Sequence, residues 1–328
     1  MNYHQRKYLP SFVLASTAFG ALLLCNPSPG LAVPFLGSDL ASFSVLGAET
    51  VTNTLTATTT LTGDVGVSTG TAITGQATLT VNGVNALSNP GDVHLNDATA
   101  ILGQGQLTTA RNDLTSLGSG LTLGANLAGL TLFPGVYTVP AGTSNLTGAL
   151  TLNGQGNASA AWVFQMPSTL ITSSGSVVNV INTGAGAGVF WNVGSSATLG
   201  TTTSFQGNIL ALTSITLNNG ATIGCGRALA DTGAVTMDHN TIGIGCGAGT
   251  GGAGSNGFIF SGGVTGPASG GTPTFPSSAF IGGGGGVGVA APEPSSLLLI
   301  GTGLVGLVFA VRRRKPSAGG HAVDELPV

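Results

Sequence analysis

Three short blocks in the second half of the sequence recur at intervals of 18 and 20 residues, and no other feature limits the possible fold as strongly. They read Ala197-Thr198-Leu199, Ile215-Thr216-Leu217 and Val235-Thr236-Met237. Each block alternates between apolar and polar residues with the period of two that a strand requires. A repeat of this length that contains strands and no helical pattern has the size of one β-solenoid coil.

A second pair of residues follows each block, five or six positions after its threonine: Ser204-Phe205, Thr222-Ile223 and Thr241-Ile242. Alternation sends one set of side chains into the core and the other set outward. The predicted inward residues are Leu199, Leu217 and Met237 with Phe205, Ile223 and Ile242. The predicted outward residues form two neighbouring columns, Thr198, Thr216 and Thr236 beside Ser204, Thr222 and Thr241. A β-sandwich would also contain short strands, but such columns favour the solenoid.

One segment breaks the strand pattern. Between Asp97 and Leu117, apolar residues recur at spacings of three and four, which is the period of an amphipathic helix. Asn96 or Asp97 can cap its first turn, and Gly118 stands where a C′ glycine belongs. The apolar stripe consists of Leu107, Ala110, Leu114 and Leu117. We therefore expect an all-β solenoid with one long α-helix packed alongside it.

Charged residues are scarce, at 6% of the chain, and the formal net charge is −3. The chain therefore has no basic stripe that could neutralise the phosphates of a nucleic acid. Its carboxylates are scattered, and no pair recurs at a spacing that would bring an acid and a base together, so we expect no enzyme. His94 and His239 have no partners at ligand spacing, so we expect no metal site and no cofactor.

The first 32 residues have the pattern of a signal peptide. A basic start precedes a mostly apolar stretch from residue 11 to residue 25, and small residues at 30–32 provide a cleavage site. The alternative is a short transmembrane helix, against which Pro27 and Pro29 argue. We therefore expect the protein to be exported.

Export makes a disulfide bond possible. Cys25 would be removed with the signal peptide, which leaves Cys225 and Cys246 as a natural pair. The alternative is two buried free thiols. The sequence thus predicts a disulfide between Cys225 and Cys246 because these two cysteines remain after the signal peptide is removed.

The C-terminal part of the chain has three further segments. Residues 248–291 are dense in glycine without an apolar period, which predicts a linker. Residues 292–315 contain Pro292-Glu293-Pro294, an apolar stretch barely long enough to cross a bilayer as a helix, and the cluster Arg312, Arg313 and Arg314. The arginines would hold their end of this transmembrane helix on the cytoplasmic side. Residues 316–328 form a tail, and the solenoid domain occupies residues 33–247.

Several sequence blocks follow one another in order between Leu36 and Gly247. They include Thr62-Gly63-Asp64-Val65-Gly66, Leu132-Phe133-Pro134-Gly135, Trp162-Val163-Phe164-Gln165 and Val189-Phe190-Trp191-Asn192. In these blocks the chain resembles the ice-binding protein family, whose fold is a right-handed β-solenoid with a parallel helix alongside. The segment from Pro292 resembles a PEP-CTERM sorting signal. That resemblance implies an exosortase-type processing enzyme and the inner membrane of a Gram-negative bacterium as partners.

The resemblance implies adsorption to the surface of an ice crystal, with inhibition of ice growth or recrystallisation. The family's ice-facing motif is Thr, then Ala or Gly, any residue, then Thr or Asn, and Thr56-Ala57-Thr58-Thr59 and Thr71-Ala72-Ile73-Thr74 match it. Stacked strands lie ~4.8 Å apart and alternate side chains repeat every ~6.7 Å, so a flat solenoid face carries a grid at spacings comparable to those of ice. The candidate ice-binding residues are Thr56, Thr59, Thr71, Thr74, Thr198, Ser204, Thr216, Thr222, Thr236 and Thr241.

A second class of function uses the same rigid solenoid. The chain could be a biofilm matrix or cell-surface adhesion protein that binds exopolysaccharide. Sugar binding favours exposed aromatic residues, and only 5% of this chain is aromatic. In both cases we expect an exported protein, anchored or released at the cell envelope or the extracellular matrix.

We predict that the segment from Pro292 to Val328 is a sorting signal that is cut, and not only a permanent anchor. Deleting it should change where the protein is found, which cell fractionation measures. Ice activity of the secreted domain should stay unchanged, because the deleted segment has no repeat of apolar residues that would pack on the solenoid. Recovery of mature cell-associated protein with an intact tail would exclude processing and leave only anchoring.

Overall fold

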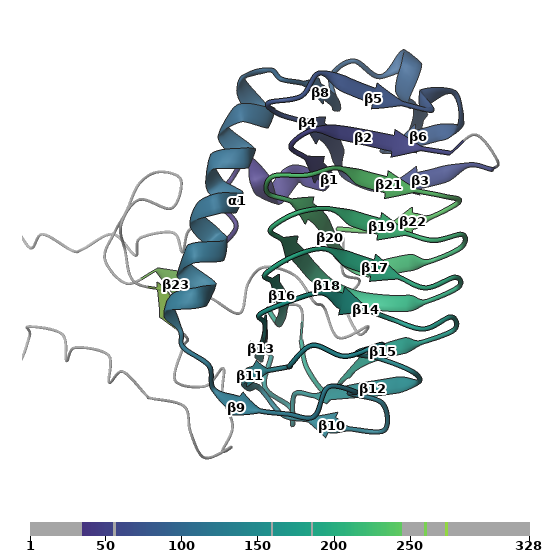
Figure 1. Ribbon diagram of the computed structural model, residues 1–328. Coiled ribbons are helices and arrows are strands. Elements are labelled where there is room, and N and C mark those ends of the chain that lie inside the picture. The colour runs from purple at the N-terminus through teal and green to yellow at the C-terminus, as the bar shows by residue number, and fades with distance from the viewer. Residues whose placement is uncertain are drawn as a thin grey trace, which may run out of the picture.

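The computed structural model describes residues 35–244 except residues 55, 56, 159 and 185, together with β23 (Ile259–Phe260) and β24 (Pro273–Thr274), which pair antiparallel. In the main domain, short strands are stacked as coils, and the strands of neighbouring coils pair in parallel (Figure 1). Each complete coil contributes strands to three faces. This mostly β architecture with one long helix agrees with the fold that the repeats predict.

The predicted segments at both ends of the chain lie outside the described residues, apart from β23 and β24. These are the signal peptide (1–32), the glycine-rich segment (248–291), the sorting segment with its transmembrane helix (292–315) and the tail (316–328). Within the described part of the chain, no helix has both the length and the hydropathy that a bilayer crossing requires.

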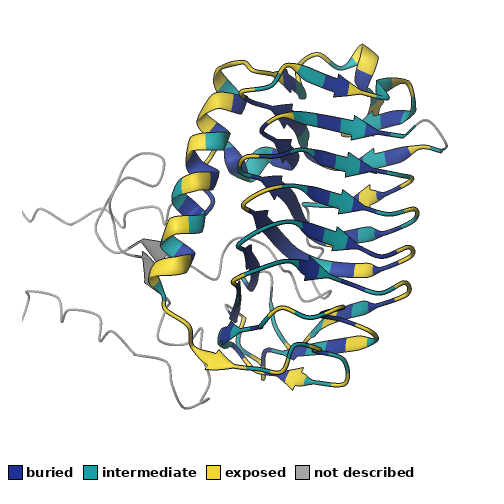
Figure 2. Cartoon of the chain, viewed as in Figure 1, coloured by how far each residue is buried: buried dark blue, intermediate teal, exposed yellow. Residues whose placement is uncertain are grey.

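The helix face is the sheet that lies against the long helix. In spatial order it contains β9 (Leu121–Thr122), β11 (Gly135–Thr138), β13 (Ala161–Met166), β16 (Gly188–Val193), the second halves of β18 (Ser204–Ala211) and β20 (Thr222–Ala230), then β1 (Phe43–Gly47), β4 (Asp64–Val67) and β8 (Val93–Leu95). Most of its residues are buried, since the core covers one side and the helix the other (Figure 2).

The six-stranded face is a separate sheet. In spatial order it contains β14 (Leu170–Ile171), β17 (Ala197–Leu199), β19 (Ile215–Leu217), β21 (Val235–Met237), β2 (Thr50–Asn53) and β5 (Ala72–Thr74). In Figure 1 these strands cross the side of the stack turned toward the viewer, away from the long helix.

The third face completes each coil. It contains β10 (Thr131–Leu132), β12 (Ala149–Asn153), β15 (Val177–Ile181), the first halves of β18 and β20, then β22 (Thr241–Ile242), β3 (Thr59–Leu61), β6 (Leu79–Val81) and β7 (Val84–Asn85), which pairs antiparallel with β6. Because β18 and β20 bend from the third face into the helix face, these two faces form one continuous sheet. Three short 3-10 helices lie between strands: η1 (Leu40–Ser42), η2 (Gln76–Thr78) and η3 (Ala86–Ser88).

The core of the solenoid contains the apolar residues of each alternating strand. The six predicted inward residues are at most 1% exposed, which confirms the alternation: they are Leu199, Leu217, Met237, Phe205, Ile223 and Ile242. Aromatic rings pack on one another inside the solenoid, with ring centroids 4.0 Å apart for Phe164 and Trp191 of the helix face and 4.9 Å apart for Trp191 and Phe205 of the third face. Such close packing from coil to coil stabilises the stack and keeps its shape fixed.

Helix α1 (Ala98–Ser116) runs along the helix face, and its limits match the predicted ones. The Asp97 carboxylate accepts a hydrogen bond from the Ala100 N–H at 2.9 Å and caps the first turn. Gly118, just beyond the helix, has a φ of +77°. The predicted stripe faces the sheet, with Leu107, Ala110 and Leu114 fully buried and Leu117 packed at the margin of the same cluster. Burial of each leucine contributes about 2 kcal/mol.

Gly103 explains how the first half of α1 can approach the sheet. A Cβ at this position would lie 2.9 Å from the ring of Phe43, so a larger residue would push the helix away. Gly105, by contrast, faces open space. The glycine that weakens the helical propensity of this segment therefore gives it a tighter contact in the folded protein.

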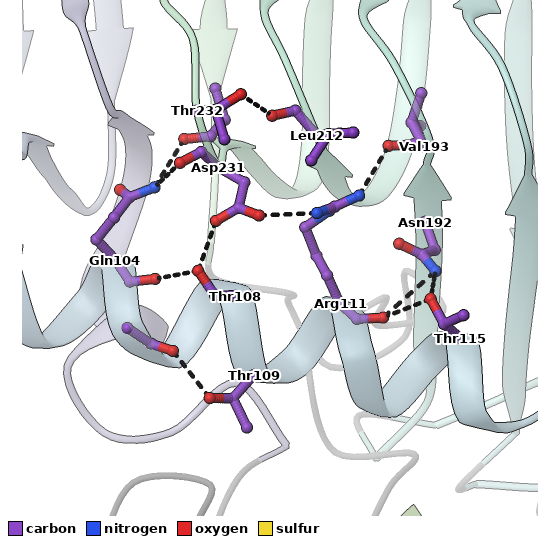
Figure 3. A network of polar contacts seen from close by, with 12 residues as sticks. Gln104, Thr108, Thr109, Arg111, Thr115, Asn192, Val193, Leu212, Asp231 and Thr232 are labelled. Atoms are coloured by element: carbon purple, nitrogen blue, oxygen red, sulfur yellow. Dashed lines mark hydrogen bonds and ion pairs between the residues drawn. The ribbon is translucent and has the colours of Figure 1, made fainter.

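Polar contacts also fix α1 to the sheet (Figure 3). The Asp231 carboxylate accepts from Arg111 Nη1 and from Thr108 Oγ1, both at 2.7 Å, and Gln104 Nε2 donates to the Asp231 carbonyl at 2.6 Å. Farther along the helix, Asn192 Nδ2 donates to Thr115 Oγ1 at 3.0 Å. These directional bonds determine where along the sheet the helix sits, which apolar contacts alone determine less sharply.

The order of the coils in space differs from their order in the sequence. The first coil (β1, β2, β3) stacks on the last coil (β20, β21, β22), with Val51 opposite Val235 and Thr60 opposite Thr241. We call this contact the seam. The second coil (β4, β5, β6) continues the stack beyond the first, and α1 then carries the chain along the stack to β9 at the other end (Figure 1). The last described coil in sequence order therefore lies in the interior of the stack.

Arg227 of β20 links the seam through a guanidinium that is 5% exposed. Its Nε and Nη2 donate to the Ala41 carbonyl at 3.2 and 2.6 Å, and its Nη1 donates to Asn208 Oδ1 at 2.9 Å. Burial lowers the pKa of Arg227 to about 10, so the group remains charged at neutral pH. A planar guanidinium can satisfy both acceptors at once, and an ammonium cannot.

Cys225 lies two positions before Arg227 and is disulfide-bonded. Its side chain packs in the main core and is 4% exposed. Cys246 lies outside the described residues. The pairing of Cys225 with Cys246 therefore stays a prediction.

We expect Arg227→Lys to lower the free energy of unfolding by about 2–3 kcal/mol, because the buried acceptors Ala41 O and Asn208 Oδ1 cannot both be satisfied by lysine. Arg111→Lys is the matched control, since lysine can keep the ion pair with Asp231 and loses the long 3.3 Å bond to the Val193 carbonyl. It should cost about 1 kcal/mol. Urea unfolding of the three proteins measures both values. Equal losses for the two variants would contradict the role of Arg227 in the seam.

Candidate functional site

The six-stranded face carries an unbroken column of threonines, which we call the threonine ladder. Strand register places Thr198, Thr216, Thr236, Thr52 and Thr74 opposite one another on successive coils. In β17, β19 and β21 the threonine is the middle residue of three, between two buried neighbours. Because successive side chains of a strand point to opposite sides, the threonine side chains point outward.

The hydroxyls of the threonine ladder are available to a ligand. Within the described part of the chain, none of these five hydroxyls takes part in a hydrogen bond. Successive rungs of a parallel sheet lie ~4.8 Å apart, so five rungs cover roughly 20 Å along the solenoid axis. The ladder therefore presents alternating hydroxyl and methyl groups at a constant spacing.

A column of small residues lies beside the threonine ladder, two positions before each rung. It consists of Ser196, Ser214, Ala234, Thr50 and Ala72. Two of its hydroxyls are used between coils: Ser196 Oγ accepts from the Ser214 N–H at 3.3 Å, and Ser214 Oγ accepts from the Ala234 N–H at 3.2 Å. These two hydrogen bonds hold Ser196 and Ser214 in place beside the rungs Thr198 and Thr216.

The third face carries a second column, which we call the second ladder. Register places Ser204, Thr222, Thr241, Thr60 and Thr80 opposite one another on successive coils. The two predicted columns are therefore present, but they are not neighbours on one face, as the prediction had them. They lie on two different sheets, separated in each coil by a turn such as residues 218–221.

The second ladder is less regular than the threonine ladder. The register of β18 against β20 shifts between Phe205 and Gly207, directly beside the rung formed by Ser204 and Thr222. The Thr222 hydroxyl is also partly engaged, since it donates to the Thr203 carbonyl at 3.4 Å. No register shift occurs between the strands of the six-stranded face. The threonine ladder is the better candidate for contact with an ordered surface.

The two four-residue motifs, at residues 56–59 and 71–74, agree with the structure to different extents. Thr74 is a rung of the threonine ladder, and Thr71 lies exposed just before β5, at the edge of the same face. Thr56 lies outside the described residues. The expectation that Thr59 faces outward is wrong: Thr59 is fully buried, and its Oγ1 accepts a hydrogen bond from the Asn240 N–H at 3.1 Å. Because Leu61 must enter the core, alternation sends Thr59 inward and Thr60 outward.

Three outward residues were missed from the sequence. Thr52 joins the threonine ladder, while Thr60 and Thr80 join the second ladder. A signal for Thr52 exists, since Thr50-Val51-Thr52 shows the alternation of the later blocks. The 18- to 20-residue spacing does not reveal that Thr52 belongs to the ladder, because the first coil is far from the last coil in the sequence although the two are stacked in space.

None of the described rungs of either ladder is a charged residue or a typical metal ligand. No strand residue of the six-stranded face is Asp, Glu, Lys or Arg. His94 lies in β8, where its Nδ1 is 2.7 Å from Asp97 Oδ2 and its Nε2 is 3.8 Å from Asp64 Oδ2. Across the described residues, no group of three or more His, Cys, Asp or Glu side chains is arranged to hold a metal ion.

The sequence matches two family profiles. The profile described as Ice-binding-like matches residues 45–243, and the PEP-CTERM protein-sorting motif matches residues 290–315. The chain is 40% identical over 311 residues to an ice-binding protein of Nostoc sp. (strain HG1), an alignment that covers 94% of this chain and 96% of that protein.

Solved structures show the same similarity. The crystal structure of an ice-binding protein from the Antarctic ascomycete Antarctomyces psychrotrophicus aligns with a TM-score of 0.58 and 35% identity, over 66% of this chain and 100% of that chain. An ice-binding protein from an Antarctic biological consortium aligns with a TM-score of 0.57 and 38% identity, over 65% of this chain and 91% of that chain.

We expect Thr59→Val to lower the free energy of unfolding by about 1–2 kcal/mol, because the Asn240 N–H would lose its acceptor inside the protein. Thr60→Val is the matched control on the next residue, which faces outward, and it should change stability by roughly 0.5 kcal/mol or less. Thermal unfolding of both variants measures the difference. A larger loss for Thr60→Val would contradict the assigned orientation of β3.

Proposed function

The chain belongs to the ice-binding-like family, and on this premise we propose that it adsorbs to ice through the six-stranded face and inhibits the growth or recrystallisation of ice. The observation that carries the proposal is the threonine ladder, with five rungs in register and free hydroxyls. Thr198, Thr216, Thr236 and Thr74 of the predicted residues belong to it, with Thr52 added and Thr71 at its edge.

The chemistry of the ladder suits ordered water. Threonine methyl groups favour a cage of water around them, and the hydroxyls hold that water through hydrogen bonds. The buried residues behind each rung hold the spacing of the hydroxyls before ice arrives. Preorganisation of this kind reduces the entropy that adsorption would otherwise cost.

The alternative function, binding of exopolysaccharide, has no comparable support. Sugar rings commonly stack on exposed aromatic side chains, and no strand of the six-stranded face contains an aromatic residue. The proposed role is that of a surface-binding protein without catalysis, in keeping with the family.

We further infer that the protein is exported and sorted at the envelope of a Gram-negative bacterium. The match to the PEP-CTERM motif at residues 290–315 supports processing by an exosortase-type enzyme. In this proposal Pro292-Glu293-Pro294 is the recognition element, and Arg312, Arg313 and Arg314 hold the end of a membrane segment on the cytoplasmic side.

We expect Thr236→Tyr to reduce ice activity by roughly fivefold or more, because a bulky ring at the central rung would hold the neighbouring rungs away from the crystal. The melting temperature should hardly change, since an exposed strand position tolerates tyrosine to within about 1 kcal/mol. Thermal hysteresis and recrystallisation assays measure the activity.

Thr241→Tyr is the matched control for this test. Thr241 lies on the same coil as Thr236 but belongs to the second ladder, so activity should be retained. The reverse pattern would assign ice binding to the third face. Full activity of both variants would exclude both ladders from the ice-binding surface.

A further inference from the structure

The chain enters the described domain on the side of the helix face. Phe35, the first described residue, packs its ring against Phe190 of β16, with centroids 5.1 Å apart. Phe35, Leu36 and Leu40 are fully buried in the apolar cluster between α1 and the sheet. The first described residue therefore lies at the helix face, and not at the six-stranded face.

Ile244, the last described residue before the glycine-rich segment, lies at the corner between the third face and the helix face. Its N–H donates to Thr62 Oγ1 at 3.2 Å. Thr62 and Gly63 form the turn from β3 of the third face to β4 of the helix face. In a coil with three faces, this corner lies opposite the six-stranded face.

The seam determines how far along the stack Ile244 lies. Because the last coil is stacked between the first coil and the rest of the solenoid, Ile244 lies beside an interior coil and not at either end of the stack. Ile244 is therefore separated from the six-stranded face and from both ends of the threonine ladder.

These positions matter because ice is a flat and extended solid. An attachment that began on the six-stranded face would hold the threonine ladder away from the crystal by its own thickness. An attachment at the opposite corner lets the carrier and the crystal lie on opposite sides of the domain. The residues between Ile244 and the sorting motif at 290–315 can reach at most about 150 Å, which exceeds the ladder's length several times.

From this arrangement we propose that the domain binds ice while its C-terminal end remains attached to a surface, so that the protein fixes its carrier, a cell or a matrix, to ice. The inference rests on the proposed function of the six-stranded face. Many attached copies would act together, since each bound copy raises the effective concentration of the next one at the crystal. Attachment then serves adhesion as well as local inhibition of ice growth.

The test attaches the full chain to beads through one cysteine introduced at each of three positions, with Cys25 replaced by serine so that it does not compete for the beads. Ser278→Cys attaches it through the glycine-rich segment, on the part of the chain that remains when the sorting signal is cut. Gly105→Cys attaches it through the outer side of α1, where a side chain meets open space. Thr216→Cys attaches it through the threonine ladder. Retention of the beads at a slowly growing ice front, compared with uncoated beads, is the measurement.

We expect beads carrying the Ser278→Cys and Gly105→Cys proteins to be held in the ice. The fraction of Thr216→Cys beads that is retained should be at least tenfold lower, at the level of uncoated beads. Thermal hysteresis of each protein before attachment is the control, because it separates the effect of attachment from that of substitution. Active free Thr216→Cys protein that loses ice retention on beads would support the proposal.

Two outcomes overturn the inference and are distinguishable. If the Ser278→Cys protein is active when free but does not hold beads to ice, attachment on this side blocks the surface, and the inference is wrong while the proposed function stands. If the wild-type full chain shows no thermal hysteresis when free, the proposed function fails, and the inference fails with it. Retention of the Thr216→Cys beads equal to that of the others would show that the six-stranded face is not the contact surface.

Discussion

The hydrogen-bonded contact between the first coil and the last coil is the interaction on which the rest of the structure depends. Three pairs of strands meet there, one on each face: β1 with β20, β2 with β21 and β3 with β22. Two rungs of the threonine ladder, Thr52 and Thr74, come from one side of this seam and three from the other. Without it, neither part would present more than a short column.

This contact joins segments that are far apart in the chain. Thr54 Oγ1, next to the seam, donates to Asp238 Oδ1 at 2.6 Å across a separation of 184 residues. Loops of this length are closed slowly, because their entropy is lost before the contacts form. The buried Arg227 lies in β20 at this contact and donates to the Ala41 carbonyl, so charged as well as neutral hydrogen bonds hold the seam together.

The sequence predicted well the features that depend on local alternation. Leu199 and Phe205 point inward and Thr198 outward because neighbouring residues decide their side of the strand, and Asp97 caps the helix because its partner is three residues away. Features that depend on the stacking order were not predictable in this way. The separation of the two ladders onto different sheets depends on the turn between them, and Thr52 depends on the seam. Thr59 was predicted to face outward because it matches a sequence motif. Its orientation is instead determined by Leu61, two residues later, which must enter the core and therefore sends Thr59 inward as well.

The interior position of the last coil also limits how this domain can change its size over evolutionary time. An open solenoid is lengthened by duplicating its terminal repeat, since each repeat contacts only its neighbours. Here a duplicated copy placed after Ile244 would find both neighbouring positions already occupied by β3 and β20. A taller domain therefore requires insertion of a whole coil between existing ones, together with a longer α1 to span the added height. Descendants of this sequence are expected to vary in the side chains of the ladder far more readily than in the number of its rungs.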